Sequence, residues 1–283
     1  MSTDTFEAAY DALLARWPAG TEAREITTPY GPTRVHSHGP ADGEPLVLLH
    51  GGGATSVSWY ANAGALATRY RVHAVDILGD AGRSRREGLP LRTAEDLTRW
   101  LDAVLDGLGL PRVHLAGHSY GAWLAATYAL HAPGRVAALA LIDPTQCFTG
   151  YRPGYLLHAL PMLLRRTRTA ARAFLAWETR GTGLPEEFAR LYELGVAEVR
   201  ARPVVGRRAE VARLRGPVLV LFAGRSRTHD AGKAAARARR LLPHARVEVL
   251  PGVTHHSVPM AGAERIDRCL LELPGQAALG SSL

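Results

Sequence analysis

The feature that most constrains the fold is the stretch Gly117-His118-Ser119-Tyr120-Gly121, which has the form Gly-x-Ser-x-Gly. The apolar run 112–116 precedes it, and the Ala- and Leu-rich segment 122–131 follows it. This order predicts a strand, a sharp turn and a helix, with the serine on the turn. Glycines two residues to either side of the serine keep bulk away from the tight backbone. A serine mounted in this way has an exposed hydroxyl above a helix N-terminus, which favours a role as a nucleophile.

The rest of the chain alternates apolar runs with helical segments. The predicted strands are 45–50, 70–76, 112–117, 135–142, 217–223 and 246–250, and the predicted helices are 58–69, 93–108, 121–131, 231–242 and 260–272. A helix over 3–17 and a hairpin over 24–38 come before them. Continuous apolar strands are typical of a sheet that is buried on both faces. The alternation therefore predicts an α/β fold, with a mostly parallel sheet flanked by helices.

Composition limits the possible partners. A chain of 283 residues can bury one large core, or one core and a small inserted cap. The net charge of +8 comes almost wholly from arginine, because Lys233 is the single lysine. The arginines are dispersed and are dense only at 164–168 and 205–208. We interpret them as a solvent-facing surface, with a site for an anionic substrate or carrier as the alternative and nucleic acid as the least favoured partner.

Compartment and cofactor are predicted from what the sequence lacks. The start, residues 1–7, has no basic region followed by an apolar run, and no stretch approaches the length of a membrane-spanning helix. Two distant cysteines, Cys147 and Cys269, favour buried thiols over a disulfide framework. The twelve histidines show no metal-ligand spacing, and no Gly-Lys-Ser/Thr follows Gly51-Gly52-Gly53. We expect a cytoplasmic protein with no metal, no cofactor and no membrane partner, and the oligomeric state stays open.

Three further segments carry a family resemblance. His50-Gly51-Gly52-Gly53 and Pro251-Gly252-Val253-Thr254-His255-His256 each follow an apolar strand, and Asp76-Ile77-Leu78-Gly79-Asp80-Ala81-Gly82-Arg83-Ser84 has nearly the form Asp-x-x-Gly-x-Gly-x-Ser. With the serine motif, the chain resembles the α/β-hydrolase family from about Tyr30 to about Leu273. The resemblance implies an eight-stranded sheet with a helical cap inserted after the sixth strand. This divides the chain into a core over 1–143 and 216–283 and a cap over 144–215.

The resemblance also implies a catalytic set. Ser119 would be the nucleophile, and it needs a base within hydrogen-bond reach. The family pattern places that base three residues after Gly252, at His255, and the neighbouring His256 is the alternative.

The position of the acid stays open, because the sequence departs from the commonest family pattern. The usual acid lies three residues after Gly224, where this chain has Arg227. Asp230 comes three residues later, and Asp143 ends the strand 135–142, where some family members carry their acid. We favour Asp143, because strand ends at that edge of the sheet converge on one crevice, and keep Asp230 as the alternative.

The oxyanion hole requires two backbone N–H groups aimed at the developing negative charge. Tyr120, directly after the nucleophile, would supply one of them. Gly52 would supply the other, with Gly53 as the next candidate. His50 and His118 lie inside the motifs, but neither occupies the position of the base, and we interpret both as structural.

These assignments predict a serine hydrolase that cleaves an ester, lactone or thioester of an apolar small molecule through an acyl-enzyme. The alternative is a lyase, cyclase or acyl transferase that uses the same serine and histidine, and a third hypothesis is a non-catalytic binding protein. Leucines of the cap, with Phe148, Tyr155 and Trp177, either line the pocket or pack the cap's own small core. The sequence does not identify the substrate.

Overall fold

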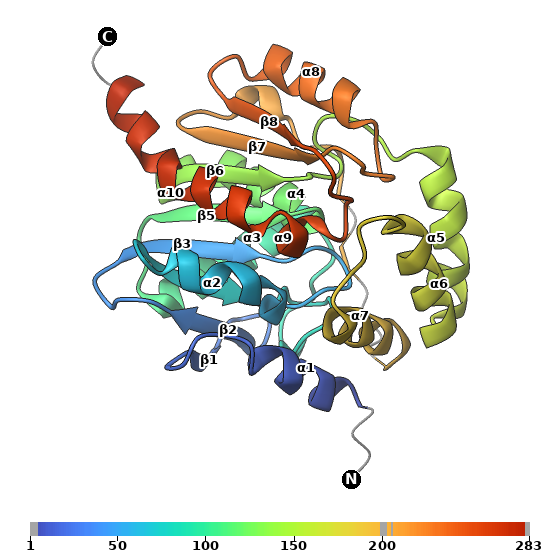
Figure 1. The fold of residues 1–283 in the computed structure, drawn as a ribbon. Helices are drawn as coiled ribbons and strands as arrows, with labels where there is room; N and C mark the ends of the chain where they lie inside the picture. The colour runs from blue at the N-terminus through green and yellow to red at the C-terminus, as the bar shows by residue number, and fades with distance from the viewer. Residues whose placement is uncertain (1–4, 199–202, 205, 281–283) are drawn as a thin grey trace.

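Eight strands form one open sheet in the order β1-β2-β4-β3-β5-β6-β7-β8 in the computed structural model, which describes residues 5–198, 203–204 and 206–280 (Figure 1). The strands are β1 (Glu22–Ile26), β2 (Thr33–His38), β3 (Glu44–Leu49), β4 (Tyr70–Val75), β5 (Val113–His118), β6 (Val136–Ile142), β7 (Val218–Ala223) and β8 (Arg246–Leu250). The hairpin β1–β2 joins β4 antiparallel, and the other pairs are parallel. The predicted α/β class is confirmed, and the predicted boundaries of the six parallel strands lie within one residue of those observed.

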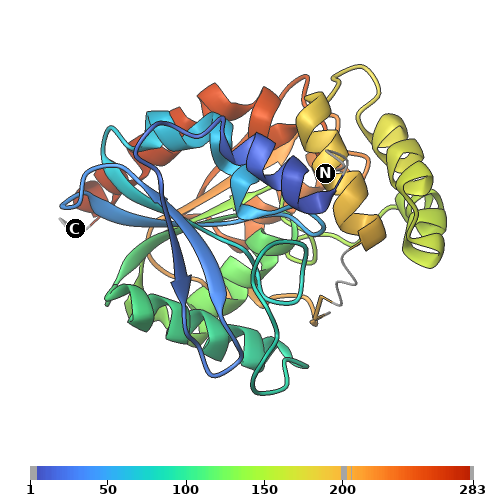
Figure 2. The ribbon, with the colours of Figure 1, turned by 90° about the horizontal axis from the view of Figure 1, so that it is seen from below.

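Helices cover both faces of the sheet (Figures 1 and 2). They are α1 (Phe6–Leu14), α2 (Tyr60–Leu66), α3 (Ala94–Leu108), α4 (Tyr120–His131), α8 (Ala231–Leu241), α9 (Val258–Ala261) and α10 (Ala263–Gly280). A capping box of Thr93 and Asp96 starts α3, and Gly109 ends it in the left-handed conformation. The last helix runs eight residues past its predicted end at 272, because the good helix formers in 276–279 continue it.

Alternating side chains of the strands build two separate cores. Leu46 and Leu48 of β3 pack with α2 and α10 on one face, whereas Val47 and Leu49 pack with α3, α4 and α8 on the other. Side chains of successive strand residues point to opposite faces, so a strand between two helical layers must be apolar throughout. This is why the central strands are continuous apolar runs. Both cysteines are buried free thiols, as predicted.

Three more helices follow β6 and lie beyond the carboxyl ends of the strands (Figures 1 and 2). They are α5 (Pro153–Arg165), α6 (Arg168–Glu178) and α7 (Glu186–Glu198), and their buried side chains form a third apolar cluster with α1. In the described residues between β6 and β7 there is no strand. The bounds 144–215 for a cap domain stay a prediction. Across the described parts of the chain, no helix is long and apolar enough to cross a bilayer.

The turn from β5 to α4 brings backbone into direct contact with backbone. A Cβ atom on Gly121 would lie 2.4 Å from the carbonyl oxygen of Leu49 and 2.5 Å from that of His50. A Cβ atom on Gly117 would lie 2.3 Å from the carbonyl oxygen of Gly121. Because backbone atoms cannot move aside as a side chain can, both positions require glycine.

We predict that Gly121→Ala lowers the free energy of unfolding by about 1–3 kcal/mol or more, because the new methyl group forces β3 and α4 apart. Gly134→Ala is the matched control, since no atom lies within 4 Å of its added Cβ atom. Urea unfolding of the parent and both variants measures the effect. Equal stability of the two variants would contradict the close packing at this turn.

Candidate active site

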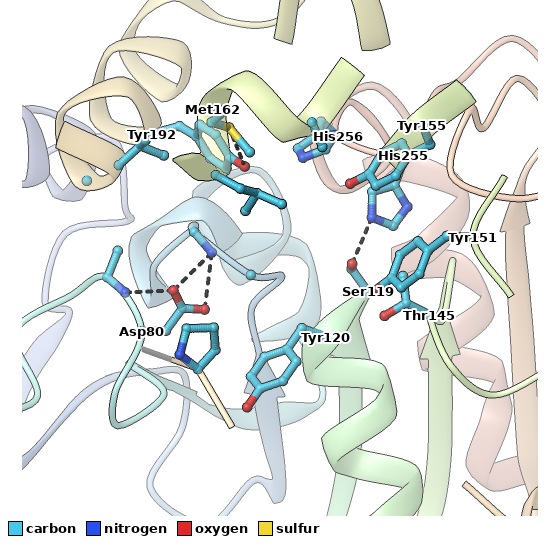
Figure 3. Close-up of a pocket in the computed structure, with 18 of the residues that line it drawn as sticks. Asp80, Ser119, Tyr120, Thr145, Tyr151, Tyr155, Met162, Tyr192, His255 and His256 are labelled. Carbon is cyan, nitrogen blue, oxygen red and sulfur yellow. Dashed lines mark hydrogen bonds between the residues drawn. The ribbon is translucent and has the colours of Figure 1, made fainter. Parts of the chain in front are cut away.

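Ser119 occupies the turn between β5 and α4 in a backbone conformation that is rare for a side chain larger than hydrogen. Its φ is 53° and its ψ is −113°. The turn is bonded to the end of β6, because the Ser119 amide donates to the carbonyl oxygen of Ile142 at 2.9 Å. Strain of this kind persists only where the surrounding structure imposes it, and it concentrates at functional sites. It lifts the serine hydroxyl beyond the end of the sheet (Figure 3).

His255, in the loop after β8, lies between the serine and a carboxylate. Its Nε2 is 2.7 Å from Ser119 Oγ and its Nδ1 is 2.6 Å from Asp143 Oδ2. An ionised carboxylate can only accept a hydrogen bond, so the proton of the neutral ring lies on Nδ1 and donates to Asp143, and Nε2 is left to accept a hydrogen bond from the serine hydroxyl. Burial lowers the pKa of His255 although Asp143 acts in the opposite direction. The ring is therefore arranged as a neutral base.

Asp143, at the end of β6, is fully buried and held by several groups. Its Oδ2 also accepts from Ser226 Oγ at 2.9 Å, and its Oδ1 accepts from the Ala223 amide at 3.0 Å. Nε2 of His229 lies 2.9 Å from Oδ1, close enough for an ion pair although not aligned as a hydrogen bond. Burial alone would raise the pKa of Asp143, but His229 and His255 hold it well below its usual range. The carboxylate is therefore ionised.

The two candidate acids occupy different places. Asp230 caps α8, where its Oδ1 accepts from the Lys233 amide at 3.0 Å, and its other oxygen lies 3.9 Å from the Arg152 guanidinium. Its side chain is 41% exposed, and in the described structure it makes no bond to His255. Of the two, the structure brings only Asp143 to His255.

The predicted oxyanion donors lie together at the bottom of the site. The Gly53 amide donates to both oxygens of Asp80, at 3.0 and 3.1 Å, so it is not available to a substrate. For the amides of Gly52 and Tyr120, no acceptor occurs among the described residues. An added Cβ atom on Gly52 would lie 3.7 Å from Tyr120 Cβ, so the two backbones border the same space beside Ser119. Two unsatisfied N–H groups next to a nucleophile can hold an oxyanion.

The other two histidines of the motifs support the loops around the site. Nε2 of His50 accepts from the Ile77 amide at 2.9 Å, so Nδ1 carries the proton and donates to the Gly51 carbonyl oxygen at 2.9 Å. Nε2 of His118 donates to the carbonyl oxygen of His255, also at 2.9 Å. Burial holds the pKa of His118 well below its usual value. His50 thus braces the glycine turn, and a neutral His118 braces the loop of the base.

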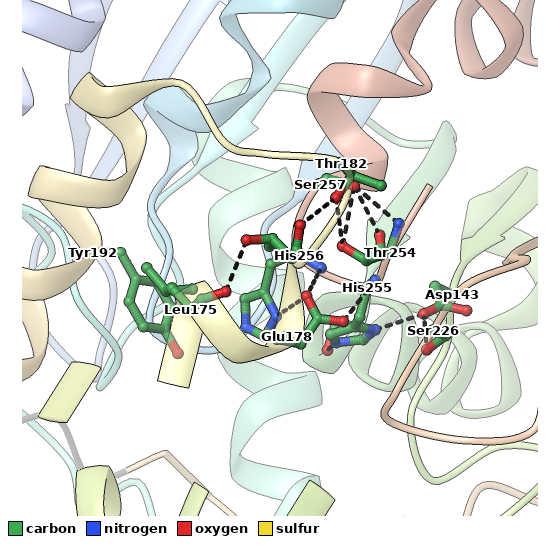
Figure 4. Close-up of polar contacts among 12 residues, drawn as sticks. Asp143, Leu175, Glu178, Thr182, Tyr192, Ser226, Thr254, His255, His256 and Ser257 are labelled. Atoms are coloured by element: carbon green, nitrogen blue, oxygen red, sulfur yellow. Dashed lines mark hydrogen bonds and ion pairs between the residues drawn. The ribbon is translucent and has the colours of Figure 1, made fainter. Parts of the chain in front are cut away.

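A buried carboxylate of α6, Glu178, holds the same loop from the other side (Figure 4). Its Oε1 accepts from the His255 amide at 3.0 Å, and its Oε2 accepts from the His256 amide at 3.1 Å. Nδ1 of His256 donates to Oε2 at 3.1 Å. Burial would raise the pKa of Glu178, but the bonds from His256 lower it to about 2. His256, the alternative base, is thus bonded to Glu178 and not to Ser119.

Sequence reasoning missed Glu178, because it belongs to no motif. The one signal was its isolation, since residues 151–177 contain no other carboxylate. A single acidic residue in an arginine-rich helix is usually a surface residue, and nothing local indicates that Glu178 is fully buried.

A cavity of about 420 Å³ opens above Ser119 (Figure 3). Its walls are mainly apolar or aromatic and include Tyr155, Leu156, Met162, Leu163, Tyr192 and Val196. Tyr155 therefore lines the pocket, whereas Phe148 packs on Phe222 and Trp177 stacks on His158, and neither borders the cavity. The described residues contain no group of three or more His, Cys, Asp or Glu that could hold a metal ion.

Comparison with known proteins shows the same architecture. The chain matches the model of the alpha/beta hydrolase family over residues 46–268. It is 31% identical over 261 residues to carboxylesterase YbfK of Bacillus subtilis (strain 168), which covers 88% of this chain and 87% of the relative. The crystal structure of carboxylesterase CesB (YbfK) from Bacillus subtilis has a TM-score of 0.87 at 29% identity and covers 95% of this chain and 96% of its own. Naproxen esterase (carboxylesterase NP) from Bacillus subtilis has a TM-score of 0.84 at 28% identity, with 95% and 98% covered.

We predict that Glu178→Gln lowers the free energy of unfolding by about 3 kcal/mol at neutral pH, which corresponds to a carboxyl pKa moved from 4.5 to about 2. A lowered carboxyl pKa stabilises the folded state above pH 4.5, and this contribution is lost as pH falls towards 2. The difference between parent and variant should therefore shrink over that range. Unfolding by urea at a series of pH values measures it.

Glu187→Gln is the control, since Glu187 is an exposed carboxylate of α7 that lies 3.5 Å from Arg16. It should change stability by less than about 1 kcal/mol. A difference between parent and Glu178→Gln that does not depend on pH would contradict an ionised Glu178.

Proposed function

The chain belongs to the alpha/beta hydrolase family, and from this membership we propose that it is a serine carboxylesterase acting on esters of apolar small molecules. The observation that carries the proposal is the continuous hydrogen-bonded series Ser119, His255 and Asp143 at the floor of an apolar cavity. The names of the full-length relatives support ester cleavage. Lactones and thioesters present the same carbonyl chemistry and belong to the proposed substrate class.

In the proposed mechanism, Ser119 Oγ attacks the carbonyl carbon while Nε2 of His255 takes the hydroxyl proton. Asp143 keeps His255 in the tautomer with the proton on Nδ1 and stabilises the imidazolium that forms. The amides of Gly52 and Tyr120 donate to the oxyanion. His255 then protonates the leaving alcohol, which departs and leaves an acyl-serine. Water gives a proton to His255 and attacks the acyl-serine. His255 then returns that proton to Ser119 Oγ as the acyl C–O bond breaks, which releases the acid and restores the serine.

The alternative is a lyase, cyclase or acyl transferase with the same serine and histidine. Arg227 stands where the usual acid would lie, but this does not favour the alternative, because Asp143 offers His255 a carboxylate from another strand. The small-molecule substrate, the cytoplasmic location and the absence of a nucleic-acid partner remain parts of this proposal.

We expect Ser119→Ala to abolish hydrolysis of a small aryl ester and Asp143→Asn to lower kcat/KM on the order of 10⁴-fold, as loss of the correct histidine tautomer does in related triads. Asp230→Asn is the matched control and should leave kcat/KM unchanged, since Asp230 caps α8. Intact-mass analysis after a fluorophosphonate probe should show one adduct on the parent and none on Ser119→Ala.

Three outcomes would oppose the proposal. An equal loss in Asp230→Asn would reject Asp143 as the acid. No adduct on the parent would reject an activated serine. An adduct without release of free acid from an ester substrate would favour the lyase, cyclase or transferase alternative.

The pH dependence of kcat/KM should report the lowered pKa of His255. Only the neutral ring can accept the serine proton, and a pKa below 6.5 keeps the ring neutral to lower pH. We therefore expect the acid limb to have its midpoint below pH 6.5. In Asp143→Asn the midpoint should move lower still, because Asp143 raises the pKa of His255. An acid-limb midpoint of the parent above pH 6.5 would contradict the lowering of the His255 pKa by burial.

A further inference from the structure

The loop between β7 and α8 contacts Asp143 with two side chains. In the commonest pattern of the family this loop carries the acid itself, at the position where this chain has Arg227. Two other residues of the loop reach Asp143 instead. Ser226 Oγ donates to Oδ2 at 2.9 Å, and Nε2 of His229 lies 2.9 Å from Oδ1. The loop therefore places a second histidine against the carboxylate that binds the proposed base.

The ring of His229 is closed off from water and held in one orientation. Its side chain is 3% exposed, and the ring packs edge-on against Phe222 with 5.7 Å between the ring centroids. The proposed mechanism does not use this ring. Because an ionisable side chain is costly to bury unless it is paired, the burial of His229 has to be explained by its contact with Asp143.

The contact requires a proton on Nε2 of His229. An ionised carboxylate can only accept, so an unprotonated nitrogen 2.9 Å from Oδ1 of Asp143 would be repelled. The N–H is nevertheless not aligned as a hydrogen bond. A neutral hydrogen bond weakens steeply when it is bent, whereas the attraction between two charges depends mainly on their separation. The geometry therefore fits a positively charged ring better than a neutral one.

The charge of Asp143 leads to the same conclusion. A carboxylate that is fully buried is destabilising unless an opposite charge compensates it. The Ser226 hydroxyl and the Ala223 amide donate hydrogen bonds but carry no charge. Two histidines also contact Asp143 in the described structure, and His255 must be neutral to act as the base. His229 is left to carry the compensating positive charge.

The other charged groups near His229 do not change this balance. Burial would lower the pKa of His229, but Asp143 raises it above its usual value. Asp230, the next residue, acts in the same direction as Asp143, and Arg152 acts against it from the segment before α5. Asp230 and Arg152 lie 3.9 Å apart, so their effects on His229 oppose each other. Asp143 is therefore the charge that controls the protonation of His229.

We infer that His229 is a positively charged positioning residue, which holds Asp143 ionised and makes His255 a weaker base. The inference rests on the proposed roles of Asp143 and His255. A positive charge at Oδ1 of Asp143 offsets part of the negative charge that Oδ2 presents to His255. His255 then stays neutral to a lower pH than it would beside an uncompensated carboxylate. Burial acts in the same direction, since it also lowers the pKa of His255.

The first experiment is the pH dependence of kcat/KM for His229→Gln. Glutamine keeps an N–H donor but cannot carry the charge. Without that charge His255 should hold its proton more tightly, so the midpoint of the acid limb should rise by about one pH unit. Lost packing alone would lower kcat/KM without raising the midpoint. His131→Gln is the matched control and should leave the midpoint unchanged, since His131 lies 3.5 Å from Asp102 at the surface.

The second experiment needs no activity. Ring-carbon NMR of the full chain with labelled histidines follows His229 and His255, each assigned by the signal that its glutamine variant lacks. His229 should titrate above pH 6.5 in the parent, because Asp143 raises its pKa. In Asp143→Asn it should titrate below 6.5, because burial then acts without the carboxylate. In His229→Gln, His255 should titrate about one pH unit higher than in the parent.

Two results would overturn the inference. One is a parent in which His229 titrates below pH 6.5, which is decided without any variant of His229 beyond its assignment. The other is a His255 signal that stays in place or moves to lower pH in His229→Gln. A parent that hydrolyses no ester would reject the proposed function, and the NMR titration would still decide whether His229 carries the charge and weakens His255.

Discussion

Close backbone packing at the end of β5 determines where the reactive groups lie. Because Gly121 lets α4 approach the carbonyl oxygens at the end of β3, the turn that carries Ser119 is fixed against the glycine turn that carries Gly52. The same turn is tied to β6 through the bond from the Ser119 amide to Ile142, one residue before Asp143. Ser119, Gly52 and Asp143, the proposed nucleophile, oxyanion donor and acid, therefore meet at one point from three adjacent strands. A larger residue at 121 would disturb all three at once.

Two carboxylates then hold the loop of the base from opposite sides. Asp143 comes from the sheet and binds the ring of His255, whereas Glu178 comes from α6 and binds the backbone of the same residue. Each carboxylate is buried and each pKa is lowered by histidine, so both are ionised at neutral pH. The position of His255 thus depends on both the sheet and α6. A displacement of α6 would be transmitted to the base without any change in the sheet.

The sequence predicted the sheet well because burial on both faces leaves a strong local pattern, as in the continuous apolar run of β3. It reduced the candidates for the acid beside His255 to Asp143 and Asp230. Residue type could not decide between them, because both are aspartates at the ends of strands or loops. What separates them is the path of the loop after β7, which makes Asp230 the cap of α8 and turns Ser226 towards Asp143. The role of Glu178 could not be predicted, because its hydrogen-bond partners are 77 and 78 residues away along the chain.

Helices α5 and α6 together have an inner and an outer surface. On the inner surface, the buried carboxylate of Glu178 bonds to the loop of His255. On the outer surface, the leucine side chains of α5 are exposed to water, which costs about 25 cal/mol for each Å² of apolar surface. A helix that served only to cover the pocket would lower its free energy with polar residues at positions 157 and 164. Leu156 and Leu163 belong to both surfaces, because they border the cavity while they are 49% and 58% exposed.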